Sequence, residues 1–321
     1  MIYIVILNWN GASDTIMCLD SLLELNSNKF KIVICDNGSS DGSLEKIESW
    51  YREKTYSSRL NLPFLKMNAV ESESCILQKN ESGIYLIDIG RNIGYAAGNN
   101  VGINFSLIQD DMEYVWLLNN DTEVHPESLS ELVHAFTSQS EIGICGSRLV
   151  YFSDRGKLQG LGGVFNPVFC SSVHYKANED ATLLFDDDEV SNDIDYVIGA
   201  SMLISRNVLL EVGNLCEDYF LYYEEIDFCL RAKNKGFRVY CATKSIVYHK
   251  EGASTKKNRK GVLADYYWVR NRLLIAKKFY PKWYFTVYLS LFMTLANRLR
   301  RGDFIKFKNV IKIILGIKVT F

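Results

Sequence analysis

The chain has 321 residues, enough to bury a sizeable core in one large domain or two small ones. Apolar residues make up 48% and charged residues 23%, which is ordinary for a globular protein. The eight cysteines are scattered and form no C-x-x-C pair, which disfavours a disulfide framework or a zinc site and indicates a reduced, cytosolic chain. No signal peptide is expected, because the apolar run at residues 2–7 is short and lacks a basic segment before it.

The net charge of −2 is distributed unevenly along the chain. Residues 256–321 carry 16 basic and 2 acidic side chains, whereas residues 1–255 carry 20 basic and 36 acidic ones. A basic end of this kind predicts contact with an anionic partner. Because apolar residues accompany the basic ones, we expect a phosphate-rich lipid surface rather than nucleic acid.

Short apolar runs and helical patterns alternate through the first half of the chain. Buried strands are predicted at residues 2–7, 31–35, 84–89, 114–118 and 142–145. The alternation predicts βαβ units on a parallel sheet. Each strand ends in a turn rich in Asn, Asp or Gly, and such turns meet at one edge of the sheet and form a cleft. Residues 55–82 are polar and are expected to form an irregular insertion or long loop.

The second half is less regular. It is expected to contain strands at 149–152, 163–169 and 196–204, a mobile acidic loop at 179–195, a helix within 219–235, and short strands at 237–241 and 245–248.

Three helical segments are predicted in the basic C-terminal region. The pattern favours helices at 262–280, 283–296 and 304–319, and the apolar run at 283–296 is shorter than the roughly 20 residues that span a bilayer. Residues 304–319 place aromatic and aliphatic side chains on one face, with lysines between them. A basic amphipathic helix of this type lies in a membrane interface. The alternative is a terminal helix pair packed on the main domain.

The sequence Asn119-Asn120-Asp121 ends the central strand at 114–118 abruptly. A carboxylate at the carboxyl end of such a strand lies where open parallel sheets bind ligands. A divalent cation that bridges a substrate diphosphate needs only one or two protein oxygens. The alternative is a polar turn in which Asp121 or Thr122 caps the following helix.

Two common nucleotide-binding motifs are missing from the sequence. No G-x-G-x-x-G follows the first strand, and the glycines at 94, 98 and 102 are spaced by four, so a dinucleotide-dependent dehydrogenase is disfavoured. No G-x-x-x-x-G-K-[ST] occurs, which excludes the common NTPase loop.

Six stretches remain that carry polar or acidic motifs. They are VILNWNG (5–11), CDNGSSDGS (35–43), NIGYAAGNNVGI (92–103), LLNNDTEV (117–124), FLYYEEIDFCLRAKNKGFRV (220–239) and VYHKEGAS (247–254). In this order and at these separations they resemble the family-2 inverting glycosyltransferases, most of all the rhamnosyltransferase-like branch that builds bacterial polysaccharides such as O-antigen and capsule.

The resemblance implies an α/β chain with the GT-A fold, in which a Rossmann-like, mostly parallel central sheet carries helices on both faces. Residues 1–255 would form the catalytic domain, with a nucleotide-binding half at about 1–125 and an acceptor-binding half at about 126–255. Residues 256–321 would form a basic, amphipathic helical extension that associates with the membrane.

The resemblance also assigns a nucleotide pocket to the strand ends. Asp36 would accept a hydrogen bond from the ring N3–H of uracil or thymine, which suits a UDP- or dTDP-sugar; alternatively it caps a turn. Small residues such as Gly94 would let the backbone approach the phosphates, although helix-on-sheet packing explains them nearly as well. The implied pocket residues are Asn8, Asn10, Asp36, Asn92, Gly94, Asn99 and Asn120.

Asn119-Asn120-Asp121 matches the family's metal-binding D-x-D motif, with Asn in place of the first Asp. The resemblance makes Asp121 the ligand of Mg²⁺ or Mn²⁺, with Asn119 beside it. His249 would complete this site or contact the diphosphate, although a lone histidine is usually structural. Gly199 and Ala200 would border the donor sugar or acceptor.

The diphosphate needs a cationic partner as well. Arg270 or Arg272 could help to neutralise it, or both could belong to the basic surface.

The general base is expected among Glu224, Glu225 and Asp227. Relatives usually carry Glu-Asp at positions 224–225 and use the second residue, so Glu225 is the first choice. A carboxylate in a partly desolvated cleft suits this role. Alternatively, the three acids simply favour the start of a helix.

We therefore expect a metal-assisted transfer of a sugar from a UDP- or dTDP-sugar to a saccharide hydroxyl, with inversion. The acceptor would be lipid-linked, at the inner face of the cytoplasmic membrane. Two alternatives are a sugar-1-phosphate nucleotidyltransferase, disfavoured because its G-x-G-x-R loop is missing, and a catalytically silent nucleotide- or saccharide-binding protein. The sugar, the nucleotide, the linkage and the oligomeric state do not follow from the sequence.

Overall fold

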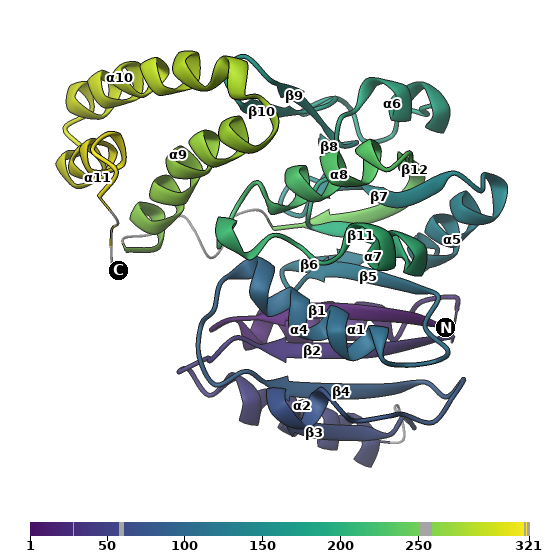
Figure 1. The fold of residues 1–321 in the computed structure, drawn as a ribbon. Helices are drawn as coiled ribbons and strands as arrows, with labels where there is room; N and C mark the ends of the chain where they lie inside the picture. The colour runs from purple at the N-terminus through teal and green to yellow at the C-terminus, as the bar shows by residue number, and fades with distance from the viewer. Residues whose placement is uncertain (28, 58–60, 251–258, 318, 320–321) are drawn as a thin grey trace.

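A computed structural model describes residues 1–27, 29–57, 61–250, 259–317 and 319. Its centre is a ten-stranded sheet in the order β3-β4-β2-β1-β5-β11-β7-β12-β6, with β8 paired to β7 (Figure 1). The strands of this sheet are β1 (Ile2–Asn8), β2 (Phe30–Asp36), β3 (Phe64–Asn68), β4 (Gly83–Asp88), β5 (Tyr114–Asn119), β6 (Thr122–Val124), β7 (Ile142–Tyr151), β8 (Leu158–Gly160), β11 (Ser201–Ser205) and β12 (Arg238–His249). A separate hairpin pairs β9 (Gly163–Asn166) with β10 (Ser171–His174).

The N-terminal half of the sheet is parallel from β3 to β5. Strands β1, β2, β4 and β5 are mostly buried and apolar because helices cover both faces of the sheet, whereas the edge strand β3 is largely exposed. The register places Asn8 beside Asp36 and Asp36 beside Asp88, so three polar strand ends lie next to one another. The predicted α/β class, with a mostly parallel sheet and helices on both faces, is confirmed.

Antiparallel strands complete the other half. β11 lies between β5 and β7 and runs antiparallel to both. β12 is a single long strand with a register shift, where the sequence pattern predicts two short ones. Its last three residues pair antiparallel with β6, which places His249 opposite Thr122.

Two apolar cores lie on the two faces of the sheet. One contains side chains of α1, α2 and α5, and the other contains side chains of α4, α7 and α8. The helices outside the C-terminal region are α1 (Ala12–Leu22), α2 (Ser43–Tyr56), α3 (Ala69–Ser72), α4 (Tyr95–Leu107), α5 (Ser128–Ser138), α6 (Asp187–Asp193), α7 (Arg206–Val212), the 3₁₀ turn η1 (Glu217–Tyr219) and α8 (Glu224–Asn234).

Two predicted loops contain regular structure. The expected irregular insertion at 55–82 contains the edge strand β3 and the short helix α3, and its polar exposed face hid the strand pattern. The expected mobile loop at 179–195 contains α6, which Asp186 caps by accepting from two backbone amides. Its acidic residues begin a helix, where the macrodipole favours them.

The C-terminal helices form a third group, with its own small core of side chains such as Tyr266 and Leu291 (Figure 1). They are α9 (Arg259–Phe279), the 3₁₀ turn η2 (Pro281–Trp283), α10 (Tyr284–Arg300) and α11 (Phe304–Ile314). Ile275 and Ala276 of α9 also belong to the core of the main domain, so α9 joins the two parts. The expected domain boundary at 255/256 lies outside the described residues.

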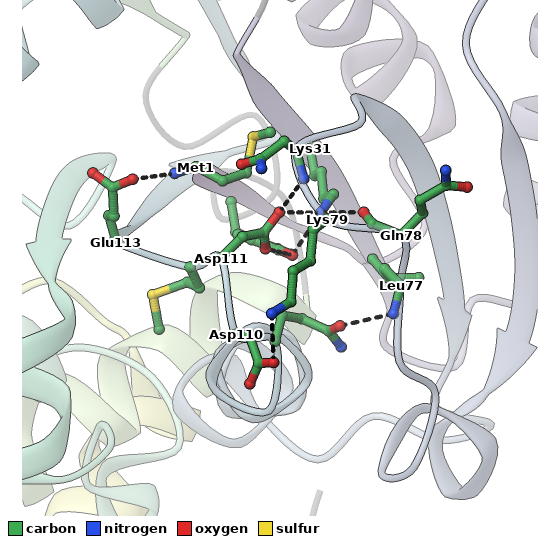
Figure 2. A network of polar contacts seen from close by, with 12 residues as sticks. Met1, Lys31, Leu77, Gln78, Lys79, Asp110, Asp111 and Glu113 are labelled. Carbon is green, nitrogen blue, oxygen red and sulfur yellow. Dashed lines mark hydrogen bonds and ion pairs between the residues drawn. The ribbon is translucent and has the colours of Figure 1, made fainter.

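A buried ionic network lies at the amino ends of β1 and β2, away from the strand ends that carry the polar turns. Figure 2 shows its polar contacts. Lys31 is fully buried and donates to Asp111 (2.8 Å), to the Tyr3 hydroxyl and to the Gln78 carbonyl. Burial alone would raise the pKa of Asp111, but hydrogen bonds from Lys31, the Asn80 amide and Tyr3 outweigh it, and the pKa is lowered. The network ties β1, β2 and the α4–β5 loop together.

We expect Asp111→Asn to lower the free energy of unfolding by about 3–5 kcal/mol, because the Lys31 ammonium would remain buried without its counter-charge. The folded-state pKa of Asp111 lies below its unfolded value of about 3.9. The carboxylate therefore stabilises the fold fully above that pH, and the contribution is lost as pH falls through the folded-state pKa. Urea unfolding at neutral and acidic pH should show the difference between variant and parent shrinking in acid.

The neighbouring Asp110 provides a matched control, since it pairs with Lys79 where both side chains are mostly exposed. Asp110→Asn is expected to leave the unfolding midpoint unchanged. Equal effects of the two substitutions would contradict the role given to burial.

Candidate active site

The ends of β1 and β2 are joined by a closed set of polar contacts. The Asn8 amide donates to Asp36 (2.6 Å) and to the Ser39 hydroxyl, and the Ser39 backbone amide donates to the other Asp36 oxygen (2.8 Å). Asn10, at positive φ, accepts from the Ser40 amide. Because Asp36 is fully buried, its carboxylate supports the turn in this structure. Its contact with a pyrimidine ring stays a prediction.

The start of α4 is fixed to the end of β2. Asn37 donates to the Asn92 side chain and to the Gly94 carbonyl (both 3.1 Å), and it accepts from the Ile93 amide. Gly94 has φ +95°, and a Cβ there would lie 2.6 Å from the Phe220 ring. Only glycine fits this position, because both the backbone conformation and the space exclude a side chain.

Three further residues of the motifs implied for the nucleotide pocket make contacts within the protein. A Cβ on Gly98 would lie 2.5 Å from Leu7, so this glycine lets α4 approach β1. Asn99 is buried and donates to the Tyr95 carbonyl within α4. Asn120 donates to Thr15 at the start of α1. The Gly98 contact supports the packing explanation that the sequence left open for the small residues, while the place of Asn99 and Asn120 in a nucleotide pocket stays a prediction.

The Tyr95 hydroxyl lies at the centre of the candidate site. It contacts Asn119 Oδ1 at 2.8 Å and the Gly199 carbonyl at 3.0 Å, and so connects α4, the end of β5 and the segment before β11. Burial raises the pKa of Tyr95 well above its usual value, and the negative charges of Glu224, Glu225 and Asp121 add to the rise. The three carboxylates therefore lie near enough to this hydroxyl for their charges to act on it.

Asp121 and His249 face each other across the β6–β12 pairing. His249 Nε2 lies 3.1 Å from Asp121 Oδ1, and Gln159 binds the other ring nitrogen at 2.8 Å. Burial alone would raise the pKa of Asp121, but the contact with His249 outweighs it, and the pKa is lowered. Gln159 orients the imidazole so that Nε2 is the ring atom directed at the carboxylate.

The donor atoms of this pair fit a divalent cation. Among the residues that the structure describes, no three His, Cys, Asp or Glu side chains gather as a complete metal site. A cation that binds together with a diphosphate takes its remaining ligands from phosphate oxygens and water. One carboxylate and one imidazole, oriented by a buried amide, are therefore sufficient protein ligands.

Glu224 and Glu225 occupy the first turn of α8. The Oε2 atoms of both lack a hydrogen-bond partner within the described part of the chain. Burial raises the pKa of Glu225 to about 7, and backbone amides of the helix start limit the rise. Burial and the adjacent Glu225 raise the pKa of Glu224 well above its usual value. A Cβ on Gly199 would make ordinary van der Waals contact with Glu225, 3.5 Å from its Cβ, so Gly199 lies directly beside this side chain.

The segment before these glutamates has an unusual backbone. Phe220, Tyr222 and Tyr223 all have positive φ, at 60°, 67° and 76°. Non-glycine residues in such conformations cost on the order of 1–3 kcal/mol each and persist only where the surroundings enforce them. The acidic start of α8 is therefore held in place at a cost in stability.

Two predicted residues lie apart from this centre. Asp227 is fully buried, with its carboxylate bound by Arg231 and Lys278 (both 2.5 Å) and by the Tyr219 hydroxyl. Arg270 donates to the Asp218 carbonyl and to Asn271. Each is engaged in holding neighbouring segments together. The buried Ala200 contributes its carbonyl, which accepts from the Asn119 amide.

Three residues of the site have no assigned role in the sequence prediction. Tyr95 and Asn37 lie inside the motifs that carry the resemblance, so their position was visible but their contacts were not. Gln159 gave no signal, because only the pairing of β8 with β7 brings it to His249.

Comparison with known families accords with this arrangement. The profile described as Glycosyltransferase like family 2 matches residues 82–267, more than half of the chain. The profile described as Glycosyl transferase family 2 matches residues 3–61. Together the two matches include the residues around Tyr95 and the strand-end turns.

Two curated relatives carry transferase names. The chain is 29% identical over 203 residues to the low-salt glycan biosynthesis hexosyltransferase Agl10 of Haloferax volcanii, a match that covers 62% of each protein. It is 24% identical over 201 residues to the dTDP-rhamnosyl transferase RfbF of Shigella flexneri, over 61% of this chain and 64% of that protein. The chain thus spans less than two thirds of the length of either relative.

One solved structure matches almost the whole chain. The mannosyltransferase PcManGT from Pyrobaculum calidifontis, in complex with GDP-Man and Mn²⁺, superposes with a TM-score of 0.55 at 12% identity, over 98% of this chain and 74% of that one. Likeness at this identity shows the fold alone, and it confirms the predicted GT-A fold. One family-2 profile matches more than half of the chain, a second matches its N-terminal part, and the fold agrees with both. The chain belongs to glycosyltransferase family 2.

Proposed function

We propose that this protein transfers a sugar from a nucleotide sugar to a hydroxyl group of a saccharide acceptor, with inversion at the anomeric carbon. One observation carries the proposal: around Tyr95, a carboxylate with a pKa near 7 lies in the same cluster as the Asp121–His249 pair. A base and a diphosphate-holding group are the two parts that such a transfer requires. Family membership and the hexosyltransferase name of one relative support it.

Glu225 is the base in this proposal. The acceptor oxygen attacks the anomeric carbon, its proton passes to the Glu225 carboxylate, and the bond from that carbon to the diphosphate oxygen breaks. The bonding electrons leave with the nucleoside diphosphate, and a single displacement inverts the configuration. A pKa near 7 suits a base that must accept a proton at neutral pH and return it to solvent. Asp227 is less suited, because Arg231 and Lys278 already bind its carboxylate.

Asp121 and His249 are the residues that would hold Mg²⁺ or Mn²⁺. A bound cation of this kind stabilises negative charge on the leaving diphosphate. The Mn²⁺ named with PcManGT supports the proposal. Gln159 keeps the imidazole oriented, and Asn119 contributes a neutral amide beside the pair.

The donor is proposed to bind at the ends of β1, β2 and β4, with its nucleobase near Asn8, Asn10 and Asp36. A UDP- or dTDP-sugar remains our expectation, and the dTDP-rhamnosyl transferase name of one relative supports a pyrimidine nucleotide. Asn92 and Gly94 border the phosphate side at the start of α4, where backbone amides favour anions.

The acceptor is proposed to be lipid-linked, with the protein bound peripherally at the inner face of the cytoplasmic membrane. Phe285, Leu289, Phe292 and Met293 form an exposed apolar stripe along α10, at helical spacing. Basic residues border the stripe and continue into α11, namely Arg298, Arg300, Arg301, Lys306, Lys308 and Lys312. Apolar side chains flanked by basic ones suit an anionic bilayer surface. None of the helices that the structure describes is long and apolar enough to cross a bilayer.

We expect Glu225→Gln to lower the rate constant for transfer by about 100- to 10,000-fold, because the acceptor proton loses its base. Binding of the nucleotide should be unchanged. The assay is release of nucleoside diphosphate from a panel of UDP-, dTDP- and GDP-sugars, and pyrophosphate release in the same assay would instead indicate nucleotidyl transfer. Asp227→Asn serves as the comparison variant. It should lower the free energy of unfolding, while the rate constant per folded molecule should fall much less than in Glu225→Gln. Full turnover by Glu225→Gln would refute the base assignment.

The transfer rate should depend on pH through Glu225. Because its folded-state pKa is about 7, the rate constant should fall about tenfold per pH unit below that value and level off above it. A raised carboxylate pKa also costs stability once the group ionises, so Glu225→Gln should raise the melting temperature more at pH 8 than at pH 5. A rate profile that is flat between pH 5 and 8 would contradict the assignment.

Asp121→Ala and His249→Ala should each weaken binding of UDP in the presence of Mn²⁺ by at least about tenfold. Losing a residue that only supports a metal ligand already costs about that much in metal affinity, and a direct ligand should cost no less. Titration calorimetry with and without Mn²⁺ separates the metal effect from direct contacts. Without metal, the variants and the parent should bind UDP alike. Equal losses in both titrations would argue against a metal role for the pair.

Replacing Leu289 and Met293 with Ser should reduce sedimentation with vesicles of phosphatidylglycerol and phosphatidylcholine, because it removes apolar area from the stripe. Added salt should weaken binding of the parent protein. Leu210→Ser is the matched control, since Leu210 is an exposed leucine on α7, outside the C-terminal helices. Undiminished sedimentation of the double variant would exclude the stripe as the membrane contact.

A further inference from the structure

A single buried amide on α9 binds the backbone that precedes the proposed base. Asn271 is fully buried, and its Nδ2 lies 2.9 Å from each of three carbonyl oxygens, those of Tyr219, Leu221 and Tyr222. These carbonyls belong to residues 219–222, a stretch that includes Phe220 and Tyr222 at positive φ and leads into α8. The contact therefore connects the C-terminal helices with the strained approach to Glu225.

The orientation of this amide is fixed by the chemistry of its partners. Arg270 can only donate, and it donates to Asn271 Oδ1 at 3.0 Å. The three backbone carbonyls can only accept, so the Asn271 nitrogen must face them. An aspartate or leucine of similar size would leave these carbonyls without a donor.

The rest of the segment packs against α9 as well. The Phe220 ring stacks on Tyr267 at 4.7 Å, and Tyr223 packs on Trp268. Farther along the helix, Lys278 binds Asp227 in the first turn of α8. The approach to α8 and the first turn of α8 thus both rest on one helix.

We infer that Asn271 is a positioning residue for Glu225: its side chain holds the segment at 219–223, which contains three residues at positive φ, and the segment sets where the Glu225 carboxylate lies. The inference rests on the proposed role of Glu225. Asn271 itself touches neither donor nor acceptor. Arg270, which the sequence suggested for the diphosphate, acts here by orienting Asn271.

The test compares Asn271→Ala with the parent protein. The rate constant for transfer should fall roughly 100-fold, the cost of a small misplacement of a reacting group. The affinity for UDP with Mn²⁺, measured by calorimetry, should stay within about twofold of the parent value. This change is much smaller than a tenfold loss of affinity, which corresponds to about 1.4 kcal/mol. Hydrogen exchange should accelerate in the segment 219–225 and remain slow in β1 and β5.

The pH profile gives a readout that general destabilisation would not change. Glu225 lies near Glu224 and Cys229 on α8, Tyr95 on α4 and Tyr196 before β11. When the segment is released, water reaches the carboxylate. The acidic limb of the rate profile should then move from about pH 7 toward the ordinary carboxyl value of about 4.3.

Two further variants keep the test decisive. Asp265→Asn removes the charge partner of Arg298 between α9 and α10 without touching the segment, and should leave the rate and profile unchanged. Arg270→Met should lower the rate constant while UDP affinity is kept, and it covers the case in which Asn271→Ala does not fold. Weaker UDP binding by Arg270→Met would instead place Arg270 on the diphosphate and overturn the inference.

The inference fails separately from the proposed function. If Glu225→Gln is inactive but Asn271→Ala keeps the parent rate and pH profile, Glu225 is the base and Asn271 does not position it. If the parent protein releases no nucleoside diphosphate from any donor, the proposed function itself is wrong.

Discussion

The Tyr95 hydroxyl is the contact on which the geometry of the site depends. Tyr95 is the first residue of α4, and its hydroxyl contacts Asn119 at the end of β5 and the carbonyl of Gly199 before β11. These segments come from both halves of the sheet, which the pairing of β5 with β11 joins, and the hydroxyl adds a side-chain contact at that junction. Glu225 and Asp121 both lie close enough to raise its pKa.

The sequence predicted those parts of the site that follow from local rules. Apolar strands that end in polar turns place Asn8, Asp36 and Asp121 at one edge, since carboxyl ends of parallel strands meet there. It did not predict that Asp36 would be enclosed by Asn8 and Ser39, or that Asn120 would turn toward Thr15. Strand periodicity gives the side of the sheet on which a residue lies, but side-chain partners depend on contacts distant in sequence.

The C-terminal half shows the same limit more clearly. Nothing in the spacing of residues 122–124 and 247–249 indicates that they pair, yet this pairing brings His249 to Asp121. Likewise, the positive charge of residues 256–321 suggested a separate extension, whereas α9 shares the main core and binds the approach to α8. Composition describes the surface of a segment and reveals little about its buried face. Helix α10, which carries the proposed membrane-binding stripe, thus follows α9, which binds the segment before the proposed base.

The asparagine at position 119, which departs from the family's D-x-D motif, is consistent with the electrostatics of this site. Glu224, Glu225 and Asp121 already lie near Tyr95, and the two glutamates have raised pKa values. An aspartate at 119 would add a fourth carboxylate beside the same hydroxyl and raise the cost of ionising Glu225 further. A neutral amide keeps the contact with Tyr95 and contributes no charge. Asn119 and a base with a pKa near 7 are therefore compatible features of one crowded acidic site, whose remaining charge a cation at Asp121 would offset.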